Sequence, residues 1–219
     1  MYKYLLFDLD GTLTESGPGI MNAAKSALQY YGIEGWSEEE LKRFIGPPLK
    51  DSFMNYCGFD EEKAVQAIVK FREYYTTKGW CENKPYEHVP EMLETLHGRG
   101  YKLIVATSKI EAQAVRICEH FGLSQYLDDI VGSDDGNRAL KKDVINFVLD
   151  KYDIRNKDEA IMIGDREHDI LGAKATGIDS MGVLYGYGSR GELEAAGADL
   201  IADTVDDIKG YFTGVFDTE

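Results

Sequence analysis

The chain has 219 residues, of which 43% are hydrophobic and 29% are charged, a composition that is ordinary for a soluble globular protein. Its 39 acidic residues outnumber its 24 basic residues, and the formal charge of −15 disfavours nucleic acid and anionic membrane surfaces as partners. The 3 cysteines show no CxxC spacing, and no apolar run is long enough to span a membrane. We therefore expect a reduced, cytoplasmic protein with no nucleic-acid partner and no membrane partner. The sequence does not indicate an oligomeric state.

The first predicted element is a short apolar run, Tyr4-Leu5-Leu6-Phe7, which is followed by Asp8, Asp10 and Gly11. Such a run is typical of a buried parallel strand, and the acids after it would lie at its carboxyl end. Open α/β sheets place their chemistry at that end. Because Asp8 and Asp10 are two residues apart, they would share one face of an extended backbone and repel each other without a cation or a shared proton.

The next part of the chain, from about Ser16 to Gly79, is predicted to contain helices only. Apolar residues recur there at helical spacing, and Ser37 with Glu40 has the pattern of a helix-capping box. Helices are expected over residues 20–31, from Ser37 onward, over 49–56, and from Asp60 to near Gly79.

From Pro90 onward, strand patterns alternate with helix patterns. Strands are expected over residues 101–106, 129–132, 160–163 and 180–184, and helices over 91–98, 111–121, 141–149 and 169–175, with a final strand and helix near Asp199 and Val205. This alternation predicts an α/β fold with a doubly wound parallel sheet. The first strand must join that sheet, because a single strand is not stable alone. We expect a core of residues 1–14 and 82–219, with an inserted all-helical domain over 15–81.

Polar residues follow several of these strands and would meet at the carboxyl edge of the sheet. They are Asp8 and Asp10, the segment 107–109, Lys141 and Lys142 at a helix start, and the segment 164–169. A cluster of acids favours a hard cation such as Mg²⁺. A hydroxyl and an ammonium group opposite it suit the oxygens of a phosphoryl group, and a carboxylate is an established nucleophile towards phosphorus.

The ordered set of motifs resembles the haloacid dehalogenase superfamily, and within it the phosphatases similar to phosphoglycolate phosphatase. Residues 8–14 (DLDGTLT) look like the first motif of the family, Thr107 like the second, the lysine before Asp143-Val144-Ile145 like the third, and Gly164-Asp165 with Asp169 like the fourth. The resemblance covers essentially the whole chain. It implies a Rossmann-like core with a small helical cap of type C1.

The resemblance also implies a role for each motif residue. Asp8 would be the nucleophile that forms an aspartyl-phosphate, and Asp10 would protonate the leaving group and then activate water. Mg²⁺ would be held by the Asp8 carboxylate, the Asp10 main-chain carbonyl and Asp165, with Asp169 orienting a ligand. Thr107 and Lys141 would bind phosphoryl oxygens. Lys141 is preferred to Lys142 because the lysine of the family stands two places before the Asp-Val-Ile stretch.

A second group of residues is expected to contact the substrate, a small phosphorylated metabolite. Its members are Gly11, Thr12, Ser108, Gly46, Pro47 and Arg138. Gly46 and Pro47 belong to a segment that resembles a cap loop reaching towards the substrate. Arg138 is a lone arginine in an acidic, glycine-containing loop. The alternative is that it is a charged surface residue with no contact to the substrate.

The most direct interpretation is a Mg²⁺-dependent phosphomonoester hydrolase. A sugar phosphomutase similar to β-phosphoglucomutase and a 5′-nucleotidase are alternatives on the same scaffold. Mutases of this kind carry a histidine soon after the first motif, where this chain has residues 16–20 (SGPGI). A phospho-receiver or regulatory module is the non-enzyme alternative. Receivers, however, are shorter and lack a helical insert.

Overall fold

The computed structural model describes residues 1–134 and 138–215, and these form two compact units. The larger unit contains Met1–Glu15 and Pro85–Glu219, and the smaller unit is Ser16–Lys84. The boundaries differ from the predicted ones by one residue at the first crossing and three at the second. At these crossings, β2 (Thr14–Glu15) pairs with β3 (Lys84–Pro85) in a two-stranded sheet that the sequence did not reveal.

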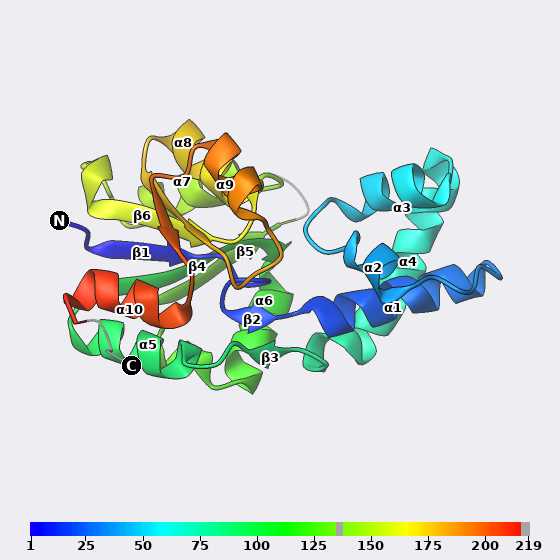
Figure 1. Cartoon of the computed structure of the whole chain (residues 1–219), viewed down its shortest axis with the longest axis horizontal. Coiled ribbons are helices and arrows are strands. Elements are labelled where there is room, and N and C mark those ends of the chain that lie inside the picture. Colours follow the sequence, from blue (N-terminus) through cyan, green and yellow to red (C-terminus); the bar gives the residue numbers. More distant parts are fainter. Residues whose placement is uncertain (135–137, 216–219) are drawn as a thin grey trace. The chain divides into compact units, whose positions relative to one another are not determined.

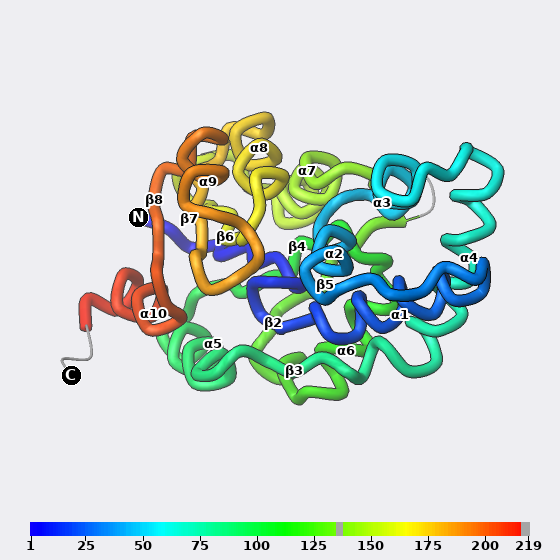
Figure 2. Tube along the Cα trace, turned by 45° about the vertical axis from the view of Figure 1, so that its right-hand side comes forward, coloured from blue at the N-terminus to red at the C-terminus, as the bar shows by residue number. Residues whose placement is uncertain are grey.

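The larger unit is a parallel sheet of six strands in the order β5-β4-β1-β6-β7-β8 (Figure 1). Its strands are β1 (Tyr4–Phe7), β4 (Lys102–Ile110), β5 (Asp129–Ser133), β6 (Ala160–Gly164), β7 (Asp179–Val183) and β8 (Leu200–Ala202). The trace in Figure 2 shows β1 beside β4 and β6, which come much later in the sequence. This confirms that the first strand joins the later sheet, and the structure adds that it lies third of the six strands.

Helices cover both faces of this sheet, which confirms the doubly wound α/β prediction. One face carries α7 (Lys141–Lys151), α8 (Glu167–Thr176) and α9 (Arg190–Ala196), and the other carries α5 (Val89–Gly98), α6 (Glu111–His120) and α10 (Val205–Thr213). Two 3₁₀ turns, η2 (Leu123–Tyr126) and η3 (Lys157–Glu159), complete the unit. Because both faces are covered, Leu5, Leu6 and Phe7 of β1 are fully buried.

Two details of the sheet unit differ from the sequence prediction. Strand β4 continues through Thr107, Ser108 and Lys109 to Ile110, with a register irregularity after Ala106, where a loop was expected. Helix α9 was not predicted at all. Its signal is a capping residue, since the Ser189 hydroxyl accepts a hydrogen bond from the Glu192 amide.

Up to Cys81 the smaller unit contains helices only, as its sequence pattern predicts, and its last residue, Lys84, begins β3. The helices are α1 (Gly17–Tyr30), α2 (Glu38–Lys42), α3 (Leu49–Cys57), α4 (Glu61–Thr77) and the 3₁₀ turn η1 (Gly79–Cys81). The expected capping box forms, because the Ser37 hydroxyl accepts from the Glu40 amide and the Glu40 carboxylate accepts from the Ser37 amide. Among all the described helices, none is long and apolar enough to cross a membrane.

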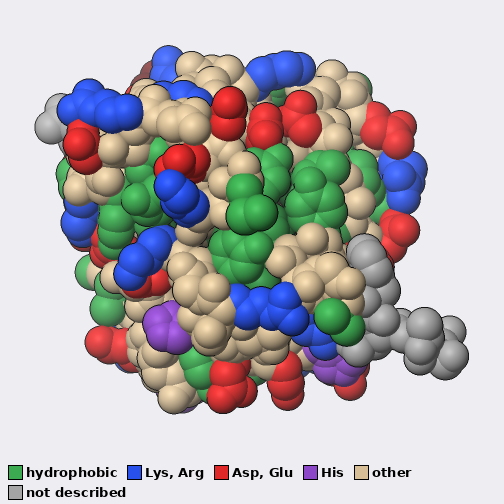
Figure 3. Space-filling model, turned by 90° about the vertical axis from the view of Figure 1, so that its left-hand side faces the viewer, with side chains coloured by type: hydrophobic (Ala, Val, Ile, Leu, Met, Phe, Trp, Pro, Cys, Tyr) green, Lys and Arg blue, Asp and Glu red, His purple; other side chains and the backbone are tan. Residues whose placement is uncertain are grey.

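The two edges of the parallel sheet have different surroundings. At the amino edge, aromatic rings contact one another, with Phe212 packing against Tyr2 and Tyr101. Figure 3 views this end of the sheet unit, where hydrophobic side chains gather near the centre and acidic and basic side chains surround them. The acids and the lysine of the sequence motifs come instead after the carboxyl ends of the strands.

Candidate active site

Strand register brings three motifs to one point. Phe7 of β1 pairs with Val105 of β4 on one side and with Ile163 of β6 on the other. Asp8, Thr107 and Asp165 therefore lie just beyond neighbouring paired residues, at the same edge of the sheet. The Asp8 amide donates to the Ile163 carbonyl at 2.9 Å, which extends this pairing to the first acid.

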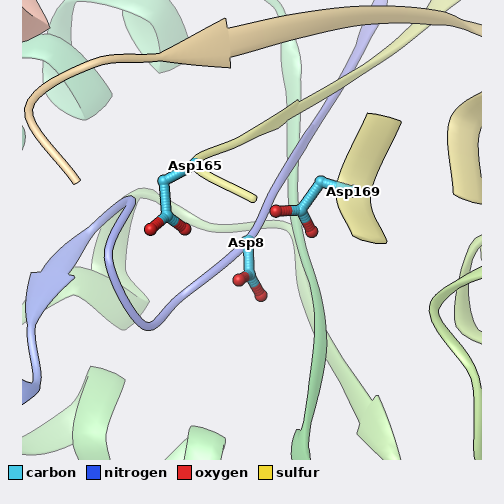
Figure 4. Close-up of side chains that lie close together, drawn as sticks. All are labelled: Asp8, Asp165 and Asp169. Atoms are coloured by element: carbon cyan, nitrogen blue, oxygen red, sulfur yellow. The ribbon is translucent and has the colours of Figure 1, made fainter. Parts of the chain in front are cut away.

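Three carboxylates form the centre of the candidate site. One oxygen each from Asp8, Asp165 and Asp169 lies within 4.8 Å of the other two. Figure 4 shows them converging from the end of β1, the end of β6 and the first turn of α8. Asp165 and Asp169 are almost completely buried, at 0% and 1% exposure. Burial, followed by the charges of Asp169 and Asp8, raises the pKa of Asp165 well above its usual value.

The cluster fits a hard divalent cation by the nature of its donors. All three side chains offer carboxylate oxygens, which Mg²⁺ and Ca²⁺ prefer, and no sulfur or imidazole ligand belongs to the group. Asp165 and Asp169 are buried and Asp8 is partly buried, and acids this close together carry a large electrostatic penalty that a cation relieves. The site residues therefore fit Mg²⁺.

Lys141 supplies the one buried ammonium group found at this cluster in the described chain. Its Nζ lies 2.7 Å from Asp8 Oδ1 and 2.8 Å from Asp169 Oδ1, and it donates to the Ala106 carbonyl at 3.0 Å. Burial alone lowers the pKa of Lys141, but the carboxylates of Asp169 and Asp8 outweigh it and raise that pKa above its usual value. Lys142 is exposed, so the structure brings the preferred lysine of the pair to the acids.

Asp10 has a separate partner that the sequence did not reveal. The Lys109 ammonium contacts Asp10 Oδ2 at 2.5 Å, and the Lys109 side chain is only 8% exposed. Within the described residues, Asp10 Oδ1 is buried and has no hydrogen-bond partner. In the sequence, Lys109 stands out only as part of the polar segment 107–109, which follows the strand expected over residues 101–106. The continuation of β4 past Thr107 is what carries it to Asp10.

The turn after β1 is shaped around Asp165. Gly11 has φ of +85°, a left-handed conformation that favours glycine, and a Cβ there would lie 2.2 Å from Asp165 Oδ2. The Thr12 side chain is fully buried, and its hydroxyl donates to Asp165 Oδ1 at 3.4 Å. These contacts give Gly11 and Thr12 a role in supporting a carboxylate, and their contact with a substrate stays a prediction.

The other expected substrate residues have mixed positions. Thr107 is 2% exposed and its hydroxyl accepts from the Lys109 amide at 3.2 Å, whereas Ser108 is exposed. The Arg138 guanidinium is paired with Glu111 at 3.0 Å and Asp134 at 3.3 Å, and it lies 4.4 Å from the Phe147 ring centre. The guanidinium of Arg138 is therefore already engaged by protein groups, and it would have to break these contacts in order to bind a substrate.

Gly46 and Pro47 lie between α2 and α3 in the smaller unit. Their predicted contact with a substrate stays a prediction.

The fold and the carboxylate-lined edge define a class, the α/β enzymes that do chemistry where parallel strands end. Residues 5–183 match the family model of the haloacid dehalogenase-like hydrolases, and the chain belongs to that family. This confirms the resemblance inferred from the four motifs.

Curated relatives with named activities cover most of the chain. A 5′-nucleotidase of Pseudomonas aeruginosa is 43% identical over 89% of this chain and 88% of its own length. A phosphoglycolate phosphatase of Vibrio parahaemolyticus is 30% identical over 94% of both chains. Tyrosine-protein kinase PtkA of Mycobacterium tuberculosis is 36% identical over 94% of this chain and 71% of its own length.

A solved structure is similar over almost the whole chain. This structure, of a predicted phosphatase from Clostridium acetobutylicum, has a TM-score of 0.91 and 45% identity over 98% of this chain and 100% of that chain. Together with the nucleotidase and phosphoglycolate phosphatase relatives, this match identifies the chain as an enzyme, a phosphatase of the haloacid dehalogenase-like family.

Proposed function

We propose that the chain is a Mg²⁺-dependent phosphomonoester hydrolase that acts on a small phosphorylated metabolite through an aspartyl-phosphate on Asp8. The observation that carries this proposal is the convergence of Asp8, Asp165 and Asp169 within 4.8 Å beside the buried Lys141 ammonium. The negative charge of the acids suits a cation. The positive charges of that cation and of the lysine in turn suit the negative oxygens of a transferring phosphoryl group.

The Asp8 carboxylate is the nucleophile of this proposal. An Asp8 oxygen forms a bond to phosphorus while the bond from phosphorus to the leaving oxygen breaks. Lys141 orients the carboxylate through its contact with Oδ1 at 2.7 Å and balances negative charge on the transferring group. Thr107 is proposed to donate its hydroxyl proton to a phosphoryl oxygen.

Asp10 is the proton carrier of the same proposal. Its Oδ2 is held by Lys109, whereas its buried Oδ1 has no partner in the described part of the chain and is available to exchange a proton. Asp10 protonates the leaving oxygen in the first step. In the second step it takes a proton from the water that attacks phosphorus and releases Asp8.

The proposed ligands of Mg²⁺ are the carboxylates of Asp8 and Asp165 and the main-chain carbonyl of Asp10, with Asp169 orienting the site. When bound, Mg²⁺ supplies positive charge that neutralises the carboxylates and the phosphoryl oxygens. Lys141 contacts Asp8 and Asp169, and its one positive charge leaves two of the three negative charges of the acids for a divalent cation to balance.

Release of phosphate from p-nitrophenyl phosphate tests the proposal. Turnover should require Mg²⁺, stop with EDTA, and fall at least about 10⁴-fold in Asp8→Asn, which keeps the size of the side chain but removes the nucleophile. Turnover by Asp8→Asn at the wild-type rate would show that Asp8 is not the nucleophile. No Mg²⁺-dependent turnover of any phosphomonoester by the wild type would reject the hydrolase proposal.

The substrate class follows from a second experiment. The relative named a 5′-nucleotidase is 43% identical to this chain, so nucleoside 5′-monophosphates belong in the first metabolite screen beside phosphoglycolate and sugar phosphates. A sugar phosphomutase would return phosphate to another hydroxyl of the sugar and release none to water. Measuring inorganic phosphate and isomerised sugar phosphate in one assay separates these two activities.

A further inference from the structure

The loop after β7 encloses the carboxylate of Asp165. In this loop, residues 184–189, the backbone amide of Tyr187 donates to Asp165 Oδ2 at 2.8 Å. Tyr187 lies 22 residues from Asp165 in the chain, so this contact is formed by the tertiary fold. Since Asp165 is fully buried, the amide partly replaces the water that this oxygen loses on folding.

Two glycines allow the loop to approach so closely. A Cβ on Gly186 would lie 2.3 Å from the Asp165 Cβ and 2.4 Å from the Gly11 carbonyl oxygen. A Cβ on Gly188 would lie 1.9 Å from the Asp165 carbonyl oxygen. These partners are mostly backbone atoms, which cannot turn away as a flexible side chain can. Residues 186 and 188 must therefore be glycine, because the space beside Asp165 does not admit a side chain.

Tyr185 attaches the same loop to the turn after β1. Its hydroxyl donates to the Thr12 carbonyl at 3.0 Å, while the Thr12 hydroxyl donates to Asp165 Oδ1 at 3.4 Å. The Tyr185 ring also packs edge-on against Tyr86, with 5.0 Å between ring centres. Burial, with a smaller effect from Asp165, raises the pKa of Tyr185, so its hydroxyl keeps the proton that it donates.

From these contacts we infer that residues 185–188 form a positioning clamp for Asp165, which fixes the orientation of this carboxylate and thereby sets the affinity of the site for Mg²⁺. The inference rests on the proposed function, because it takes Asp165 to be a ligand of the cation. None of these residues was expected from the sequence motifs. Tyr185, Gly186, Tyr187 and Gly188 are positioning residues, since they act through Asp165.

The loop would raise the affinity for Mg²⁺ because a carboxylate that is free to rotate must be fixed when the cation binds, and fixing it costs free energy. A carboxylate held by Tyr187 on one oxygen and by Thr12 on the other has little freedom left to lose when a cation binds. If the loop moves outward, Asp165 loses a charge-assisted hydrogen bond and must be reoriented by the cation itself. Loss of such indirect support typically weakens metal affinity by about 10–100-fold.

Calorimetric titration of the whole protein with Mg²⁺, in the absence of substrate, tests the clamp. Gly188→Ala should weaken Mg²⁺ binding by about 10–100-fold. Its matched control is Gly191→Ala in α9, where a new Cβ meets nothing within 4 Å and the affinity should stay at the wild-type value.

A milder pair of variants removes one hydroxyl group each. Tyr185→Phe should weaken Mg²⁺ binding by about fivefold, because it releases the loop from Thr12. Its matched control is Tyr101→Phe, since the Tyr101 hydroxyl also donates to a backbone carbonyl, that of Phe212 at 2.8 Å, at the other edge of the sheet. If Gly188→Ala fails to fold, as judged by its thermal transition in EDTA, the Tyr185→Phe comparison decides.

Kinetics separate a positioning role from a general loss of stability. With p-nitrophenyl phosphate, the clamp variants should need more Mg²⁺ for half-maximal rate but recover most of kcat at saturating Mg²⁺. Wild-type Mg²⁺ affinity in Tyr185→Phe and in a folded Gly188→Ala would overturn the clamp while leaving the proposed hydrolase intact. A wild-type protein that does not bind Mg²⁺ would overturn both proposals.

Discussion

The sheet unit and the helical unit use charged residues in opposite ways. In the sheet unit, Lys141, Asp165 and Asp169 are buried around one point. In the described helical unit, the ion pairs lie at the surface, as in Lys42 with Glu39 and Lys70 with Glu73. Surface pairs of this kind contribute little to stability and are screened by salt, whereas buried charges act in a medium where each interaction is strong. The buried charges therefore place the proposed chemistry in the sheet unit.

The interior of the helical unit is correspondingly apolar and aromatic. Phe53 lies between Phe44 and Phe59, with ring centres 5.0 Å and 6.0 Å away. Substitutions in this unit should therefore change stability more than Mg²⁺ binding, and substitutions at the acidic cluster should do the reverse.

The largest expected effect in this comparison belongs to Asp10→Asn. This substitution removes the proposed proton carrier but keeps the main-chain carbonyl, so turnover should fall by about 10²–10⁴-fold while Mg²⁺ affinity stays nearly unchanged. Phosphate release and calorimetry measure the two quantities. Loss of Mg²⁺ binding in this variant would contradict the assignment of the carbonyl as the ligand.

A smaller effect on rate is expected for Lys141→Met. Turnover should fall by about 10²–10³-fold, because the variant loses a group that balances charge on the transferring phosphoryl. Asp8 and Asp169 also lose their ammonium partner, so the free energy of unfolding in EDTA should fall by about 3–5 kcal/mol. Added Mg²⁺ should restore part of this stability, as urea unfolding with and without the ion will measure.

Lys142→Met is the matched control for that variant. Lys142 is the next residue of the same helix but is exposed, so its substitution should change the free energy of unfolding by less than about 0.5 kcal/mol and leave turnover unchanged. Equal losses of turnover and of unfolding free energy in Lys141→Met and Lys142→Met would contradict the different positions that the structure gives the two lysines.

Local sequence patterns predicted most of the sheet unit and the main acids of the site. Asp8 and Asp165 could be found because each follows a buried apolar strand, and parallel strands bring their carboxyl ends to one edge. Helix α9 was missed because its seven residues are too few for a clear helical period, although the pair Ser189 and Glu192 carried a capping signal.

Contacts that depend on the tertiary fold could not be predicted in the same way. The position of Lys109 against Asp10 depends on the unexpected length of β4, which no apolar pattern marks beyond Ala106. The fit of Gly186 and Gly188 around Asp165 joins segments that only the folded sheet brings together. A glycine in a loop sequence indicates a turn, whereas the close approach that requires it is visible only in three dimensions.

Gly19→Ala in the helical unit is expected to lower the stability of the protein and to have the smallest effect on the proposed active site. A Cβ on Gly19 of α1 would lie 2.0 Å from the Gly79 carbonyl oxygen in η1, so the two segments must separate. Crowding of this kind costs about 1–3 kcal/mol, which urea unfolding can measure. Gly98→Ala is the control, because that glycine at the end of α5 has nothing within 4 Å of a new Cβ.

The same Gly19→Ala protein should bind Mg²⁺ with wild-type affinity, since the proposed ligands all lie in the sheet unit. Calorimetry on the folded variant measures this directly. A loss of Mg²⁺ affinity as large as that expected for Gly188→Ala would show that the helical unit controls the cation site. The division of roles between the two units would then be wrong, because a packing change in one unit would have altered charge binding in the other.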